Sequence, residues 1–152
     1  MQSQEKDNLI IARFFPNENV FEQLKNLCLK HNIKTGVVLS GIGQLGFVEL
    51  GFFKEKGNYT PQKFESPLEV LNISGIISAN EKSLPLHHNE VWRGGEYDFH
   101  LHINLSNEQK NTLGGHFIGG IVSVTLEIAI LKTDIAIKRD IEEKTGLRGL
   151  FF

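Results

Sequence analysis

Apolar and polar residues alternate with a period of two over several stretches of this 152-residue chain. In a strand, successive side chains point to opposite faces of the sheet, so this period is typical of half-buried strands. The strongest candidates are residues 9–15, 36–40, 68–78, 99–105 and 121–130. In the last of these, Val122 to Ile130 place an apolar side chain at every second position. The pattern predicts a mainly antiparallel β-sheet.

One segment has the spacing of a helix instead. Its apolar or weakly polar residues recur every three or four positions: Val20, Leu24, Leu27, Cys28 and His31. Asn17 or Asn19 can cap this helix, Asn19 followed by Glu22 has the form of a capping box, and Asn32 is an acceptable end. We therefore expect one main helix after the first strand, with His31 as a helix-end residue.

The C-terminal part predicts a further strand and a further helix. Residues 134–137 are expected to extend the sheet, and the tail from Arg139 to Phe152 ends in a short amphipathic stretch. The fold class predicted is α+β: a mainly antiparallel sheet flanked by the main helix and a short C-terminal helix. The length suggests a single domain over residues 1–152.

Between these elements lie glycine-rich and polar segments. Residues 41–46 (GIGQLG) have the form of a dinucleotide fingerprint, but the following residues predict a strand, whereas that site needs a helix N-terminus. We interpret them as a turn between two strands. Residues 54–67 are expected to form a loop or the end of a hairpin. The pair His87-His88 falls in an irregular segment, and adjacent extended residues rarely bind one ion together.

Composition narrows the functional classes. No apolar run approaches the length of a membrane span, and the first eight residues are too polar for a signal peptide. The single cysteine, Cys28, suits a reducing compartment, so we expect a cytoplasmic protein in which Cys28 is a buried structural thiol. Sixteen basic residues face 18 acidic ones without a basic cluster, which gives no support for binding to phosphate backbones.

Three histidines carry the candidate chemistry. Within the alternating segment 99–105, His100 and His102 lie on one face, about 6.6 Å apart at their backbones. A zinc–nitrogen bond is about 2.0–2.1 Å long, so both rings can lean onto one ion, and His116 after a glycine pair can supply the third ligand. Without a metal, the same residues would be ordinary half-exposed strand histidines.

Two carboxylates are candidates to support this site. Glu127 lies within the apolar strand 121–130, where burial would require a partner, and Glu69 begins the strand 68–78. Either could orient a histidine from the second layer of the site, or act as a base for a metal-activated water. Glu127 could instead be an edge residue exposed to solvent. The sequence contains no evident pairing of a nucleophile with a base, so a catalytic residue stays unknown.

Five segments in a fixed order resemble the plants-and-prokaryotes-conserved (PPC) domain, a family that carries a DNA-binding label. They are residues 36–43 (GVVLSGIG), 69–75 (EVLNISG), 100–105 (HLHINL), 114–117 (GGHF) and 125–128 (TLEI). The resemblance extends from about residue 8 to residue 146. It implies an α+β fold, a homotrimer, and a metal site, zinc or a similar divalent ion, at His100, His102 and His116.

In plant members of that family, a separate basic arm centred on Arg-Gly-Arg-Pro contacts DNA. The present sequence contains no such motif, and its arginines are scattered: Arg13, Arg93, Arg139 and Arg148. The sequence therefore favours a trimeric metal-binding module of unknown ligand. The alternatives are a zinc-dependent hydrolase or lyase acting on a small molecule, and a DNA-binding protein as the family label suggests.

Overall fold

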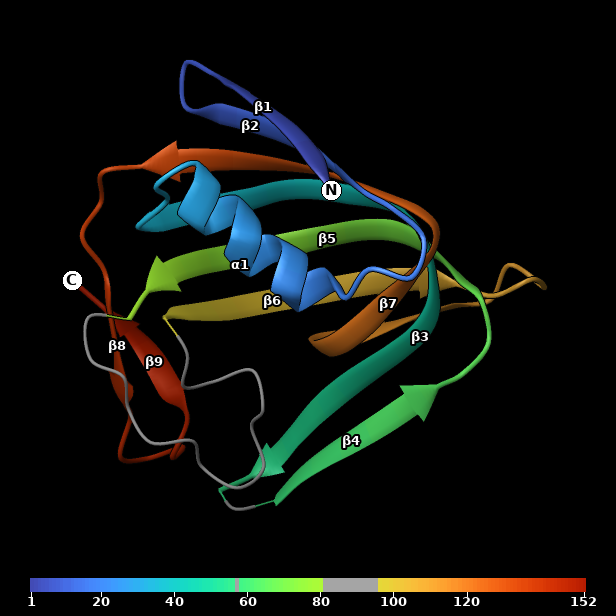
Figure 1. Ribbon diagram of the computed structural model, residues 1–152. Coiled ribbons are helices and arrows are strands. Elements are labelled where there is room, and N and C mark those ends of the chain that lie inside the picture. Colours follow the sequence, from blue (N-terminus) through green and yellow to red (C-terminus); the bar gives the residue numbers. More distant parts are fainter. Residues whose placement is uncertain (57, 81–95) are drawn as a thin grey trace.

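The computed structural model describes residues 1–56, 58–80 and 96–152 (Figure 1). One helix, α1 (Val20–Lys30), accompanies the strands of this part of the chain. The strands are β1 (Gln2–Lys6), β2 (Leu9–Phe14), β3 (Thr35–Glu55), β4 (Asn58–Phe64), β5 (Leu68–Ala79), β6 (Tyr97–Ser106), β7 (Thr112–Thr133), β8 (Lys138–Ile141) and β9 (Arg148–Phe151). A mainly antiparallel sheet with one main helix is thus confirmed.

The sheet closes on itself. Its order is β1-β2-β7-β6-β5-β3-β4, and β7 pairs with β3 as well, so that β3, β5, β6 and β7 form a ring. All pairings among the described strands are antiparallel. The two long strands β3 and β7 curve through the molecule and lie side by side over much of their length (Figure 1). Closure of this kind leaves fewer free strand edges to pair with other chains.

The turn predicted at residues 41–46 is wrong. These residues continue β3 without a break, and the sequence irregularity appears as β-bulges where β3 pairs with β7. Gly43 has a φ of +149°, and a Cβ atom there would lie 2.0 Å from the carbonyl oxygen of Thr125. The glycine therefore permits a close approach of two strands rather than a reversal of the chain. The alternation in residues 121–130 predicts that Val124 is buried with Val122 and Leu126. Val124 is instead exposed, in the part of β7 where the pairing with β3 is irregular.

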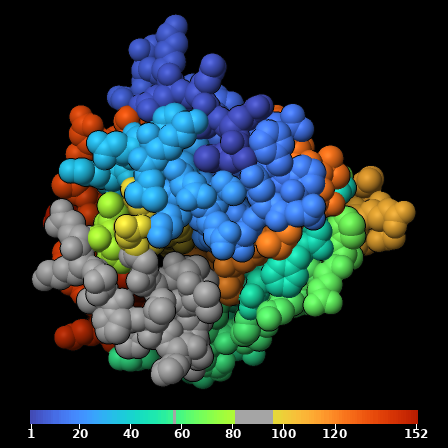
Figure 2. All heavy atoms as spheres, in the orientation of Figure 1, coloured from blue at the N-terminus to red at the C-terminus, as the bar shows by residue number. Residues whose placement is uncertain are grey.

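Helix α1 begins as predicted. The side chain of Asn19 accepts hydrogen bonds from the backbone N–H groups of Phe21 and Glu22. The helix buries its apolar face and lies across the surface seen in Figure 2. Cys28 is fully buried, and burial raises the pKa of its thiol to about 12, so the thiol stays protonated at neutral pH. This confirms that Cys28 is a buried thiol.

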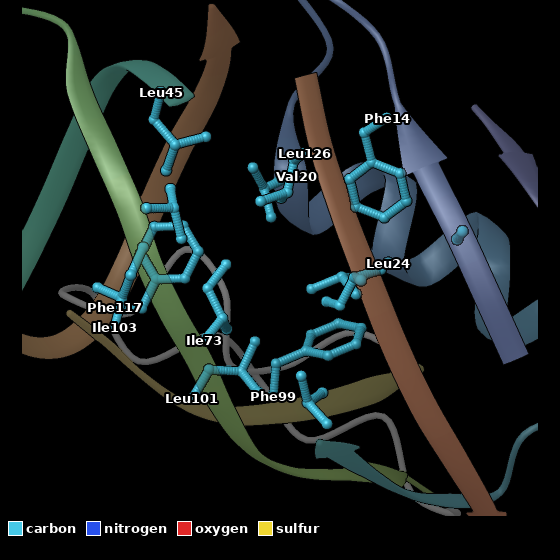
Figure 3. Packing of buried hydrophobic residues seen from close by; sticks show 14 of the residues in the cluster. Phe14, Val20, Leu24, Leu45, Ile73, Phe99, Leu101, Ile103, Phe117 and Leu126 are labelled. Atoms are coloured by element: carbon cyan, nitrogen blue, oxygen red, sulfur yellow. The ribbon is translucent and has the colours of Figure 1, made fainter. Parts of the chain in front are cut away.

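The core fills the space between the helix and the inner face of the sheet. Figure 3 shows Val20 and Leu24 of α1 near Leu126 of β7, and Leu101 and Ile103 of β6 near Ile73 of β5. On β6 the alternation holds at every predicted position: Phe99, Leu101, Ile103 and Leu105 are buried, whereas His100, His102 and Asn104 are exposed. The core thus fixes which face of β6 carries the histidines.

The C-terminal predictions are corrected by the structure. Residues 134–137 form no strand, and the tail forms the two-stranded sheet β8–β9 instead of a short helix. Gly146 at φ +71° donates its backbone N–H to the carbonyl of Glu142, which reverses the chain between the two strands. Gly149 inside the stretch further disfavours a helix.

Two smaller elements complete the comparison. Of residues 54–67, expected to be a loop or the end of a hairpin, residues 58–64 form the strand β4, which pairs with β3; neither β4 nor the short strand β1, which pairs with β2, was predicted. The described residues contain no helix that is long and apolar enough to span a membrane. The segment holding His87 and His88 lies outside the described residues.

Candidate metal centre

The pairing of β6 with β7 brings the three predicted histidines together. His102 lies directly opposite His116 in the register of β6 and β7. His100 lies two residues before His102, on the same face of β6. The ring centroids of His100 and His102 are 5.6 Å apart, and each lies 5.3 Å from the ring of His116. His116 is buried, while the other two rings reach solvent. Three residues from two strands therefore form one cluster.

The cluster suits a divalent ion. Each histidine offers one nitrogen, and these atoms all lie within 4.8 Å of one another. Ligands at about 2.0–2.1 Å from a tetrahedral ion would lie about 3.3 Å apart, so the rings need to close by at most about 1.5 Å. Three imidazoles leave a fourth coordination position for water or a ligand, as in catalytic zinc sites. The donor set thus fits a zinc-like ion.

The histidines open into a cavity of about 410 Å³. Its walls come from elements far apart in the sequence: Phe52 and Phe53 from the end of β3, Tyr59 from β4, and Arg139, Leu147 and Arg148 from the C-terminal hairpin. In Figure 1 the end of β3, the start of β4 and the β8–β9 hairpin lie at the same end of the molecule. A hydrogen bond of 2.9 Å from the Lys56 ammonium to the carbonyl of Glu143 joins them.

Tyr59 packs beside the buried ligand. Its ring meets the ring of His116 edge-on, with centroids 6.1 Å apart. The room for the phenol comes from Gly51, which lies opposite both His116 on β7 and Pro61 on β4. A Cβ atom at Gly51 would lie 2.0 Å from the Tyr59 hydroxyl oxygen. Glycine at this position therefore lets an aromatic wall close over His116.

The C-terminal hairpin is held against β6 by a buried ion pair. The Arg148 guanidinium lies 3.1 Å from a carboxylate oxygen of Asp98, and both side chains are largely buried. Arg148 also donates to the side-chain oxygen of Asn80 at 3.2 Å and to the carbonyl oxygen of Arg139 at 3.1 Å. This anchoring places the side chain of Arg139 beside His100, with 3.4 Å between Nη1 and the imidazole Nδ1.

The two predicted carboxylates lie elsewhere. Glu127 is exposed on the part of β7 that pairs with Arg13 of β2, far along the strand from His116. Glu69 is exposed at the start of β5, opposite Ser106, and accepts a hydrogen bond of 2.8 Å from Gln44. Neither is among the residues that line the cavity. The structure brings the three histidines together and leaves both glutamates outside their surroundings.

His31 also lies elsewhere, as predicted. It caps the C-terminus of α1, and its Nδ1 lies 2.9 Å from a carboxylate oxygen of Glu5 on β1. The pKa of Glu5 is lowered by its hydrogen bond to Lys132 and, after that, by the one to His31. His31 thus ties the helix to the N-terminal hairpin.

Sequence reasoning missed the polar residues around the cavity. Asp98, Arg139 and Arg148 are separated by up to fifty positions, so the sequence shows no cluster of charged residues here. Asp98 stands two residues before His100, on the face of β6 that the alternation assigns to the histidines, and this position is the signal that the sequence offers for it. The sequence gives no signal that Arg139 lies beside His100, because the C-terminal tail that contains Arg139 predicts a short helix.

The architecture and the cluster together define a class: a closed antiparallel sheet with one covering helix and three convergent histidines at one end. The family model of the Plants and Prokaryotes Conserved (PCC) domain matches residues 1–134. The chain therefore belongs to the PCC domain family, also written PPC.

Solved structures share this fold. A "putative dna binding protein" from Bacteroides thetaiotaomicron superposes with a TM-score of 0.85 at 23% identity, covering 99% of this chain and 96% of that one. The PPC protein of Pyrococcus horikoshii gives 0.74 at 23% identity, covering 99% and 96%. A metal-containing protein from Archaeoglobus fulgidus gives 0.78 at 19% identity, covering 97% and 96%.

A curated relative contains a similar segment within a much larger protein. The bifunctional protein GlmU of Synechococcus sp. (strain JA-2-3B'a(2-13)) is 24% identical over 119 residues. The match covers 78% of this chain and 16% of that protein.

Proposed function

We propose that this chain is a trimeric PPC-domain module that binds one zinc-like divalent ion per subunit through His100, His102 and His116. The observation that carries the proposal is the convergence of three imidazole nitrogens within 4.8 Å of one another at the mouth of a cavity. The Archaeoglobus relative is described as metal-containing, which supports the same assignment. Imidazole nitrogens suit zinc and similar transition metals.

The cavity beside the histidines favours a second function, that of a zinc-dependent hydrolase or lyase acting on a small molecule. A bound ion would polarise a carbonyl or activate a water at its open position. Of the chain's own residues, Tyr59 borders the buried ligand, Arg139 supplies positive charge, and Phe52 and Phe53 supply apolar walls. Asp98 is engaged by Arg148, so we do not assign it as a general base.

Metal analysis tests the primary proposal. We expect purified protein, loaded with Zn²⁺ and dialysed, to retain about one ion per chain, and EDTA to remove it. Retention of less than about a tenth of an ion per chain would contradict the proposal. Screening small-molecule hydrolysis and lyase substrates before and after EDTA treatment distinguishes the enzyme from the binding module.

The trimer is proposed on the family resemblance and on exposed apolar side chains. Leu39 and Ile42 of β3, Leu71 of the adjacent β5 and Val124 of β7 are each about half exposed in the single chain. Ile121 and Ala129 of β7 are only partly covered. An apolar strand exposed to this degree suits burial against a neighbouring subunit.

Light scattering at micromolar concentration is expected to give the mass of three chains. Ile42→Asp should shift the mass toward one chain, because a carboxylate would be desolvated in the interface. Ile135→Asp is the matched control, since Ile135 is similarly exposed but lies in the segment after β7. A monomeric wild-type protein, or an Ile42→Asp protein that stays trimeric, would count against this arrangement.

We further expect that the chain alone does not bind duplex DNA usefully at physiological salt. Affinity for DNA comes largely from cations that neutralise phosphates. Here the net charge is −2, and several cations are paired within the chain: Lys25 with Glu96, Lys132 with Glu5, Lys138 with Asp140, and Arg148 with Asp98. An anisotropy titration in about 150 mM salt decides the matter, and specific binding in the nanomolar range would refute it.

A further inference from the structure

We propose that Arg139 is the anion-binding residue of the metal cavity, and that the cavity takes a small organic carboxylate held by both the ion and the Arg139 guanidinium. This inference rests on the proposed metal site and names the chemical class of its ligand. Arg139 reaches the cavity from the C-terminal hairpin, outside the three-histidine cluster.

The contact between Arg139 and His100 cannot persist when an ion binds. A guanidinium only donates hydrogen bonds, so at 3.4 Å from Nη1 the His100 Nδ1 must be the acceptor. If the ion binds Nδ1, it takes the lone pair that Arg139 uses. If the ion binds Nε2, the neutral ring carries its proton on Nδ1 and can no longer accept. In both cases metal binding ends the hydrogen bond between the Arg139 guanidinium and His100.

The backbone keeps the side chain of Arg139 at the cavity. Arg139 lies opposite Leu150 in the β8–β9 pairing, and its carbonyl oxygen accepts a hydrogen bond from Arg148. Arg148 is fixed in turn by the buried carboxylate of Asp98 on β6, two residues before His100. The anchor and the candidate ligand therefore belong to the same strand, and Arg139 stays within reach of the site.

The charges then favour an anion. A divalent ion and a guanidinium that line one small cavity repel each other, and the repulsion is weakened when a negatively charged group lies between them. A carboxylate suits both partners, because one oxygen can occupy the open metal position while the guanidinium fork donates to the carboxylate group. The phosphate ion shares this chemistry but has no apolar part.

The walls favour an organic acid over inorganic phosphate. Phe52 is 67% exposed beside the cavity, and Phe53 and Leu147 add further apolar surface. These side chains would cover a hydrocarbon or aromatic group attached to the carboxylate. A volume of about 410 Å³ is suited to a small molecule rather than to a polymer.

The test uses the full chain loaded with Co²⁺, whose visible absorption reports changes at the metal. Benzoate and inorganic phosphate are titrated separately, and the change in the Co²⁺ band gives each affinity. We expect benzoate to bind more tightly than phosphate. Arg139→Gln should weaken benzoate by at least about tenfold, since a charge-assisted hydrogen bond is lost. Arg139→Lys should restore part of the loss, because it keeps the charge but not the fork.

Lys138→Gln is the matched control, because it removes a positive charge from the neighbouring residue of β8, where Lys138 pairs with Asp140. We expect it to bind benzoate like the wild type. Co²⁺ affinity provides a second readout: Arg139→Gln should bind Co²⁺ at least as tightly as the wild type, because His100 no longer contacts a guanidinium. If Arg139 served only to hold the hairpin in place, Arg139→Gln would lower the Co²⁺ affinity instead.

The outcomes separate the two proposals. If the wild type fails to bind Co²⁺, the proposed metal site is wrong and this inference fails with it. If Co²⁺ binds but benzoate affinity is the same in Arg139→Gln, only the role of Arg139 is overturned. If phosphate binds more tightly than benzoate, the organic carboxylate is the wrong ligand class.

Discussion

Replacing His116 with alanine is expected to weaken metal binding by more than about 100-fold. Loss of a residue that only supports a ligand already costs about 10–100-fold, and His116 would be a ligand itself. It is also the buried member of the cluster, opposite His102 and packed edge-on against Tyr59. Its ring is therefore the best positioned before the ion arrives. Competition with a chromophoric zinc chelator measures the affinity of each variant.

His31→Ala is the matched control for this substitution. It removes an imidazole at the end of α1 that contacts Glu5 and Ser3, away from the cluster. We expect it to leave metal affinity unchanged. Full metal content in the double variant His100→Ala/His102→Ala would show that the ion binds elsewhere, and the assignment of the site would be abandoned.

Gly75→Ala is expected to lower the free energy of unfolding by about 3 kcal/mol or more. Gly75 has a φ of +149°, which L-residues with a side chain rarely adopt. A Cβ atom there would also lie 2.0 Å from the carbonyl oxygen of His100. Strands β5 and β6 would have to separate where β6 carries the first metal ligand. Urea unfolding measures the loss, and we expect metal affinity to fall as well.

Gly46→Ala distinguishes this effect from the general consequences of adding a methyl group. Gly46 lies in β3, and its Cβ would meet Ser123 at 3.6 Å, an ordinary contact distance. We expect its stability to change by under about 1 kcal/mol. If Gly75→Ala were as stable as Gly46→Ala, the close approach of β5 and β6 would not be a requirement of the fold.

The sequence by itself determined the local elements and the faces of the strands. The alternation around His100 and His102 was correct because burial of Phe99, Leu101, Ile103 and Leu105 forces the intervening residues to the other side. The Asn19 cap and the apolar face of α1 were equally local, since a cap and a helical stripe need only residues within a few positions. The three candidate ligands could therefore be named from the sequence, and the family resemblance implied the same three residues.

The tertiary structure alone decided how distant segments meet. Period-two alternation does not reveal whether a glycine reverses the chain or lets two strands approach closely. Only the pairing of β3 with β7 shows that Gly43 permits a close approach. The sequence predicts a helix in the C-terminal tail, whereas the structure has a hairpin there. The positive φ of Gly146 and the ion pair between Arg148 and Asp98 stabilise this hairpin. Because such contacts join residues far apart in the sequence, no local pattern could place Arg139 beside His100 or Glu127 away from it.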